Sequence, residues 1–222
     1  MRLSFKTAFS FQINRYLLLC PFVMNSEYLK KLITQRRTRK PALFSKQIPD
    51  RSKVIECIET ARNAPNHHHT EPARFYLLDP KTIKAVGQLF GEVVAGDGTN
   101  RVLLEKGERK KMEWGEAPGL LIVTCRTDRE SILVQKHPAV IEEDYATCCC
   151  ICQNLSLLFE SEGLACKWST GAVWEHPKFA KTIRMQEPQH ERIVALLFYG
   201  YSEQILQPRP LAPLNNYLIC NY

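Results

Sequence analysis

The chain has 222 residues, of which 45% are hydrophobic and 24% are charged. This length supports one sizeable hydrophobic core, and the composition excludes a largely disordered chain and gives no reason for a second domain. The 30 basic and 23 acidic residues leave a formal net charge of +7, which suits an anionic partner.

The basic residues are scattered along the chain except in two clusters, Arg36–Lys40 and Lys106–Lys111. Nucleic acid is one anionic partner that such clusters bind. However, no zinc-finger spacing and no aromatic-rich RNA-binding signature accompanies them. We therefore expect no nucleic acid partner.

Nine cysteines are present, an odd number, and four of them lie within residues 148–152. Adjacent thiols on a helix point about 100° apart, so they do not pair easily with one another. Reduced cysteines in a cytoplasmic protein are the better interpretation. Cys148 and Cys152 share one helical face, where packing as small hydrophobic residues is favoured over a disulfide or a bound metal.

The first 23 residues differ from the rest of the chain. Arg2 and Lys6 precede a short apolar stretch at residues 16–23, an arrangement that faintly resembles a signal peptide. The stretch is too short to span a bilayer, and no small-x-small cleavage site follows it. We expect residues 1–23 to be an N-terminal extension, disordered or upstream of the true start, residues 24–222 to form a single domain, and no membrane partner.

Hydrophobic spacing and turn residues predict long helices and few strands. The expected helices cover residues 25–35, 50–64, 80–94, 100–112, 142–162 and 176–183. The expected strands cover residues 74–78, 120–125, 164–168 and 193–199, before an irregular tail. This order of elements predicts an α+β domain.

Two of these helices show apolar faces that we expect to be buried. The second helix, opened by Asp50, presents Val54, Ile55, Ile58 and Ala61. The longest helix, closed by Gly163, presents Ala146, Cys149, Cys150, Gln153, Leu157 and Leu158.

The cluster Arg36–Lys40 follows the first predicted helix. The C-terminal end of a helix repels anions, so Arg36 and Arg37 must themselves attract any bound phosphate. Guanidinium groups match phosphate oxygens in a bidentate fashion, and Thr38 adds a hydroxyl and an amide. A basic run taken alone is more often a solvated surface, so only its companions in the chain decide between the two interpretations.

These companions resemble the nitroreductase family of FMN enzymes. The run Arg36-Arg37-Thr38-x-Lys40 resembles the family's R-R-S-x-R/K signature. Further similar segments follow in the family's order: Ala64-Pro65-Asn66 (A-P-S), Glu71-Pro72-Ala73-Arg74-Phe75 (Q-P-W-x-F), Trp168-Ser169-Thr170-Gly171 (W-x-S/T-G), the final strand 193–201 and the tail 207–211. The resemblance covers residues 25–211 and is greatest to the short bacterial members. Glu71 and Ala73 replace the usual Gln and Trp, and Ser202 stands where Pro is common, so we expect an altered substrate preference.

The resemblance implies a central, mostly antiparallel sheet flanked by helices, with FMN at a homodimer interface. Carried over position by position, it implies that Arg36, Arg37 and Thr38 hold the FMN phosphate and ribityl chain and that Lys40 lies near the flavin N1 and O2 edge. The remaining implied cofactor-binding residues are Asn63, His67, Trp168, Ser169, Thr170, Gly171 and Arg209, and together the set comes from two chains.

The implied activity is hydride transfer from NADH or NADPH through FMN to a small-molecule electron acceptor, such as a nitroaromatic or a quinone, by a ping-pong mechanism. No side chain is expected to act as a catalytic acid, base or nucleophile. The alternative is a non-catalytic basic module that binds a phosphate-bearing ligand or nucleic acid. No metal is expected at His67-His68-His69, because adjacent histidines in a loop rarely converge on one ion and no carboxylate is spaced as in a known motif.

Overall fold

The structure is a computed structural model that describes residues 26–207 and 209–220. The chain divides into two units after Gln35, and the described part of the first unit is helix α2 (Ser26–Gln35). Its end lies at the predicted residue. The expected extension, residues 1–23, and the first residue of the predicted helix, Asn25, lie outside the described residues.

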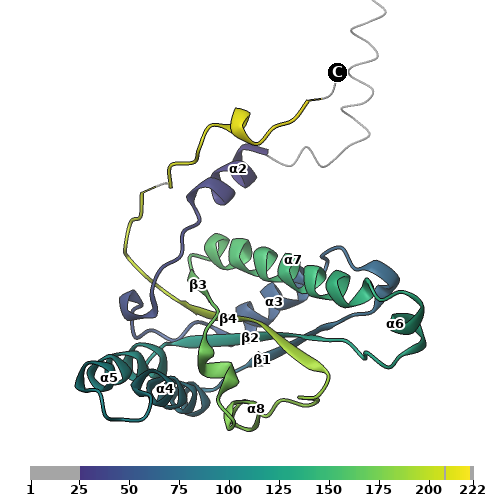
Figure 1. Ribbon diagram of the computed structural model, residues 1–222. Helices are drawn as coiled ribbons and strands as arrows, with labels where there is room; N and C mark the ends of the chain where they lie inside the picture. Colours follow the sequence, from purple (N-terminus) through teal and green to yellow (C-terminus); the bar gives the residue numbers. More distant parts are fainter. Residues whose placement is uncertain (1–25, 208, 221–222) are drawn as a thin grey trace, which may run out of the picture. The chain divides into compact units, whose positions relative to one another are not determined.

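The second unit is built on a four-stranded sheet (Figure 1). Its strands are β1 (Ala73–Leu77), β2 (Gly119–Arg126), β3 (Ala165–Ser169) and β4 (Glu191–Gly200). Their order is β1-β2-β4-β3, and every neighbouring pair is antiparallel. The predicted α+β class with a mostly antiparallel sheet is confirmed.

The two faces of the sheet bury different sets of side chains. In β2, Leu121 and Val123 pack into one core cluster, whereas Leu120 and Ile122 pack into the other. This alternation is the normal period of a strand, and burial on both faces explains the continuous apolar run in the sequence. A register shift after Val123 marks a bulge in the pairing of β2 with β4.

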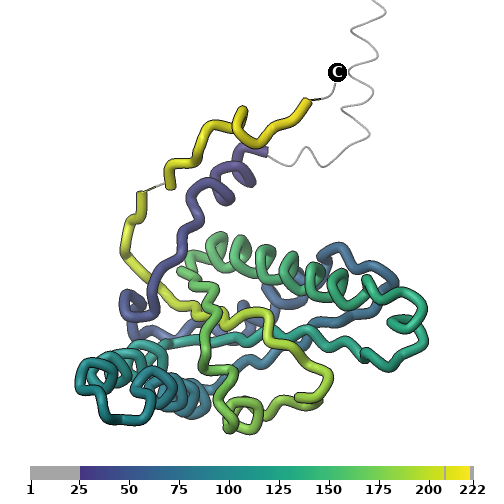
Figure 2. The backbone as a smooth tube through the Cα atoms, in the orientation of Figure 1, coloured from purple at the N-terminus to yellow at the C-terminus, as the bar shows by residue number. Residues whose placement is uncertain are grey.

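Helices cover both faces, as Figures 1 and 2 show. One face carries α3 (Arg51–Ala61) and α7 (Val140–Ser161), and the other carries α4 (Pro80–Ala95), α5 (Arg101–Gly115) and α8 (Phe179–Thr182). Shorter helices complete the connections: η1 (Pro41–Leu43), η2 (His67–His69), α6 (Ile132–Lys136), η3 (Ala172–Glu175) and η4 (Leu214–Asn216).

Local signals determine the helix ends. The Asp50 carboxylate accepts a hydrogen bond from the Ser52 amide and caps α3. After α7, Gly163 has a φ of 73°, and the Leu164 amide donates to the Phe159 carbonyl at 2.8 Å. This is the glycine-terminated helix end that the sequence predicts.

The predicted buried face of α7 is wrong in part, since Cys149 and Leu158 pack against the core but three other predicted residues do not. Ala146, Cys150 and Gln153 are exposed, and Cys149, Leu157 and Leu158 are only half-buried. The buried residues are instead Val140, Asp144, Thr147, Cys148, Ile151, Cys152, Leu155, Ser156 and Phe159. The helix carries apolar residues around much of its circumference, and three of the residues that face the core are polar, so the pattern pointed to the wrong side.

Smaller corrections concern the buried face of α3 and the helices α6, α8 and η4. Ile55 is 44% exposed, and Cys57 is buried in its place. Helix α6 has no counterpart in the prediction. The helix predicted over residues 176–183 is reduced to α8 and is preceded by η3, and the tail contains η4. Cys148 and Cys152 are fully buried in the core, which confirms that they pack as small hydrophobic residues. Among the residues described, no helix combines the length and the apolar character needed to cross a membrane.

Candidate functional site

The basic segment, residues 36–40, lies along the free edge of β3. Thr38 forms a parallel bridge with Cys166, and the Arg39 amide donates to the Cys166 carbonyl at 3.2 Å. Because Trp168 and Gly171 follow Cys166 by only a few residues, the structure brings the basic segment close to the beginning of the predicted flavin-lining segment 168–171.

Arg39 serves the structure rather than a ligand. Its guanidinium forms a bidentate pair with Glu160 near the end of α7, with distances of 2.8 Å (Nη1 to Oε2) and 3.3 Å (Nη2 to Oε1). Both side chains are largely buried, at 15% and 17% exposure. Arg39 Nε also donates to the Gln204 carbonyl at 3.2 Å. These contacts fix the path of the segment, and they give a role to the one residue of the cluster that the sequence left without one.

The other cations of the segment keep their charge uncompensated. Within the described ranges, no carboxylate lies in ion-pair distance of Arg36, Arg37 or Lys40. Arg37 donates to two carbonyl oxygens of the described chain, to that of Arg36 at 2.7 Å and to that of Gln207 at 3.4 Å. The second of these contacts brings the C-terminal tail to the segment, two residues before the exposed Arg209.

The segment 168–171 combines buried and open positions. Trp168 is half-buried against the core, Ser169 is buried and Thr170 is exposed. Gly171 has an extended backbone, with a φ of −172°. A Cβ placed there would meet the rings of Trp114 and Phe90 at ordinary distances of 3.7 and 3.8 Å. Nothing in the chain's own packing therefore requires glycine at residue 171.

Lys167, directly before the segment 168–171, is a candidate site residue that the sequence analysis did not name. Its ammonium group lies 3.7 Å from Glu113 Oε1 and 5.8 Å from the centre of the Trp114 ring. Burial lowers the pKa of Lys167. The sequence signal that could have identified Lys167 is a charged residue between Cys166 and Trp168 in a short, largely buried strand. Trp114, by contrast, is core, because it is 2% exposed and stacks on Phe90.

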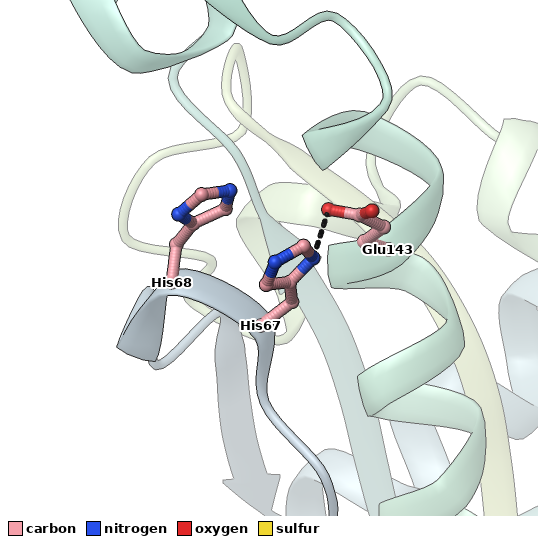
Figure 3. Close-up of side chains that lie close together, drawn as sticks. All are labelled: His67, His68 and Glu143. Atoms are coloured by element: carbon pink, nitrogen blue, oxygen red, sulfur yellow. Dashed lines mark ion pairs between the residues drawn. The ribbon is translucent and has the colours of Figure 1, made fainter.

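Two predicted residues remain: Asn63 follows the end of α3, beside the middle of α7, and His67 lies at the start of α7. Both side chains are exposed. Asn63 Nδ2 donates to the Thr60 carbonyl at 3.0 Å, at the end of α3. His67 Nδ1 lies 2.9 Å from Glu143 Oε2 (Figure 3). Glu143 comes from a distant part of the sequence, so no local pattern could pair it with His67.

The loop that carries His67 is held by a buried carboxylate. Asp144 is 3% exposed and accepts hydrogen bonds of 2.5 Å from the hydroxyls of Thr70 and Thr127. The loop backbone is strained, with φ values of 56° at His68, 50° at His69 and 49° at Glu71. The Glu71 carboxylate lies 3.6 Å from Arg62 Nη2, so the carboxylate that departs from the family pattern is partly compensated.

Helix α7 separates His67 from the basic segment. Arg39 is anchored to Glu160 near one end of the helix, and His67 contacts Glu143 near the other. The two glutamates are 17 residues apart, which corresponds to about 25 Å along a helix. One chain therefore does not bring the basic segment and the His67 loop together.

Comparisons with known proteins agree with this fold. The family model described as the nitroreductase family matches residues 33–201. "Putative NAD(P)H nitroreductase YfhC" of Bacillus subtilis is 28% identical over 183 residues, covering 81% of this chain and 89% of that protein. The crystal structure of a nitroreductase-like family protein from Bacillus cereus has a TM-score of 0.70 and 24% identity, covering 86% of this chain and 95% of that one. A nitroreductase with bound FMN from Bacteroides fragilis has a TM-score of 0.65 and 17% identity, covering 86% and 97% of the two chains. The chain belongs to the nitroreductase family.

Proposed function

We propose that the protein is an FMN-dependent oxidoreductase that takes hydride from NADH or NADPH and reduces a nitroaromatic, a quinone or a similar acceptor. The family match, the name of the Bacillus subtilis relative and the FMN in the Bacteroides fragilis structure support this proposal. The observation that carries it is the set of uncompensated cations, Arg36, Arg37 and Lys40, along the edge of β3.

These side chains fit a phosphate-bearing cofactor. Arg36 and Arg37 present planar guanidinium groups that match phosphate oxygens, and Thr38 is exposed and adds a hydroxyl. Arg209 is proposed as a second phosphate contact, since the tail already reaches Arg37 at Gln207. Lys40 is assigned to the N1 and O2 edge of the flavin, where a cation stabilises the negative charge of the reduced ring.

The segment 168–171 is proposed as the wall along which the flavin lies. Trp168, Ser169 and Thr170 line it. Gly171 has no Cβ and no packing reason to be glycine, which suits the close approach of a flat ring to the backbone. Bound FMN would supply the hydride relay, so that NAD(P)H and the acceptor use the same place in turn, a ping-pong sequence. No side chain is assigned as a catalytic acid or base.

We propose a homodimer, in which Asn63 and His67 of one chain complete the FMN site of the other. The separation of about 25 Å along α7 supports this for His67, because one chain keeps His67 apart from the basic segment. The outer face of α7 is a suitable contact, with Ala146, Cys150 and Gln153 exposed. Sedimentation should show twice the chain mass of 25.6 kDa, and a 25.6 kDa species at micromolar concentration would contradict the dimer.

Reconstitution with FMN tests the cofactor site. The wild-type protein should take up FMN and show flavin absorbance. Arg36→Ala should lose at least about tenfold in FMN affinity, because charge-assisted contacts to phosphate are among the stronger hydrogen bonds. Lys106→Ala is the matched control, since it removes one exposed positive charge from the other basic cluster and should bind FMN normally. Unchanged affinity in Arg36→Ala would overturn the assignment of the phosphate site.

The non-catalytic alternative uses the same basic segment, residues 36–40, for another phosphate-bearing ligand or for nucleic acid. Purified protein that is colourless and does not bind added FMN would favour this alternative.

We also propose a cytoplasmic location, which suits the buried thiols of Cys148 and Cys152 in the core. Glu71 and Ala73 are proposed to alter the choice of acceptor, with the effect of Glu71 reduced by Arg62.

A further inference from the structure

Three potential metal ligands meet where η2 faces the start of α7. His67, His68 and Glu143 each offer one ligand atom, and these atoms all lie within 4.8 Å of one another (Figure 3). The two imidazole rings stack at 4.1 Å with an angle of 11° between their planes. The left-handed backbone at His68, with a φ of 56°, lets neighbouring side chains lie on the same side of the loop. The structure therefore contains the convergence that was not expected from the sequence.

The position of the loop is fixed by its own anchors. The Thr70 hydroxyl donates to the buried Asp144, and the Thr70 amide donates to Asn66 Oδ1 at 3.2 Å. Asp144 is the neighbour of Glu143 in α7, so the same helical turn holds the loop and presents the carboxylate. Strained backbone that its surroundings hold in place is a recurrent feature of functional sites.

We propose that His67, His68 and Glu143 form a binding site for a divalent transition-metal ion of the zinc type. Two imidazole nitrogens and one carboxylate oxygen are a ligand set that zinc accepts, with water as the fourth ligand. Imidazole favours zinc, copper or nickel over magnesium and calcium, which prefer oxygen. This inference does not depend on the proposed flavin function.

The observed distances suit such an ion after one local adjustment. His67 Nδ1 and Glu143 Oε2 are 2.9 Å apart, close to the spacing of about 3.3 Å between two ligand atoms of a tetrahedral zinc. The ion would lie between these two atoms. His68 must turn out of its stack to direct a nitrogen at the ion, and its exposed position permits this rotation. Coordination through Nδ1 leaves Nε2 of His67 for the flavin contact proposed above.

A third imidazole lies close to the proposed site. The His137 ring is 5.6 Å from the His68 ring. Among the described residues, no lysine or arginine pairs with Glu143, whereas the neighbouring Glu142 lies 3.9 Å from Arg192. The charge of Glu143 is therefore available to the ion.

Zinc titration of the full chain, free of FMN, tests the site by calorimetry and by the change in Tm. We expect one zinc ion per chain and a rise in Tm, because a ligand that binds the folded state stabilises it. His68→Asn and Glu143→Gln should each weaken zinc binding by at least about tenfold, since each removes a direct ligand. Asparagine tolerates a positive φ, so His68→Asn keeps the loop conformation.

His69→Asn is the matched control. It changes the next histidine of the same loop, also at positive φ (50°), and His69 is not part of the cluster. It should bind zinc like the wild type. Equal weakening in all three variants would show unspecific binding to surface histidines and would overturn the proposal, as would wild-type protein that neither binds zinc nor gains Tm. FMN uptake measured in parallel tests the flavin proposal separately, because neither His68 nor Glu143 is assigned to the flavin.

Discussion

The two ends of α7 use glutamates in opposite ways. Near the C-terminal end, Glu160 is largely buried and pairs with Arg39, while near the N-terminal end Glu143 is more exposed and meets a histidine. A carboxylate is favoured by the helix dipole at the first end of a helix and disfavoured at the last. Glu160 therefore needs its arginine, whereas Glu143 is stable without a cationic partner and can offer its charge to a ligand.

The same contrast between a paired and an unpaired charge occurs within the basic segment. Arg39 is neutralised by Glu160 and holds the segment against β3, while Arg36, Arg37 and Lys40 remain available to an anion. At the other end the same division occurs between adjacent residues: Asp144 holds the loop from inside the core, and Glu143 faces outward.

The largest effect is expected when the buried pair is broken. Glu160→Gln leaves the Arg39 guanidinium without its carboxylate in a largely buried place and should lower the free energy of unfolding by about 2–3 kcal/mol. Urea denaturation measures this. Glu162→Gln is the matched control at the same helix end. It removes only an exposed contact of 3.3 Å with Lys53, so we expect a loss below about 1 kcal/mol. Equal losses would mean that Glu160 has no special structural role.

The sequence was sufficient for the four strands, for the long helices and for the order of the motifs, but not for α6. Caps such as Asp50 and Gly163 are local signals, and the structure confirms the helix ends that they predict. The buried face of α7 could not be obtained in this way. Asp144, Thr147 and Ser156 face the core because partners from other elements or the helix's own carbonyls satisfy their polar groups.

The site was accessible from the sequence only in part. The resemblance selects Arg36 and His67 as residues of one type of site, but chain order does not show that about 25 Å of helix separates their anchors. The pairing of His67 with Glu143 is a tertiary contact with no sequence signal, and the same holds for Lys167 with Glu113. Both contacts depend on how helices pack on the sheet.

A smaller effect is expected from Asp144→Asn. The amide keeps one acceptor oxygen but presents an NH₂ group to one of the two threonine hydroxyls, which must then reverse its hydrogen bond. We expect a loss of about 1–2 kcal/mol in the free energy of unfolding and faster hydrogen exchange in residues 66–72. Glu142→Gln makes the same change of charge two residues away at an exposed side chain and should have little effect. If exchange in the loop is unchanged, Asp144 does not hold it.

The smallest expected effect is on the alkylation of cysteines in the middle of α7, which tests which face of this helix is exposed to solvent. Cys148 and Cys152 are fully buried, and burial raises the pKa of the Cys152 thiol, so neither should react with iodoacetamide until the protein unfolds. Cys150 is exposed in the single chain and should react in dilute protein. Because the proposed dimer covers this face of α7, the alkylation of Cys150 should slow as the protein concentration rises.

Mass spectrometry of tryptic peptides identifies the labelled residue, and Cys150→Ser should remove the concentration-dependent signal. A Cys150 rate that is independent of concentration would place the dimer contact away from this face of α7, while labelling of Cys148 in the folded protein would contradict the buried face itself.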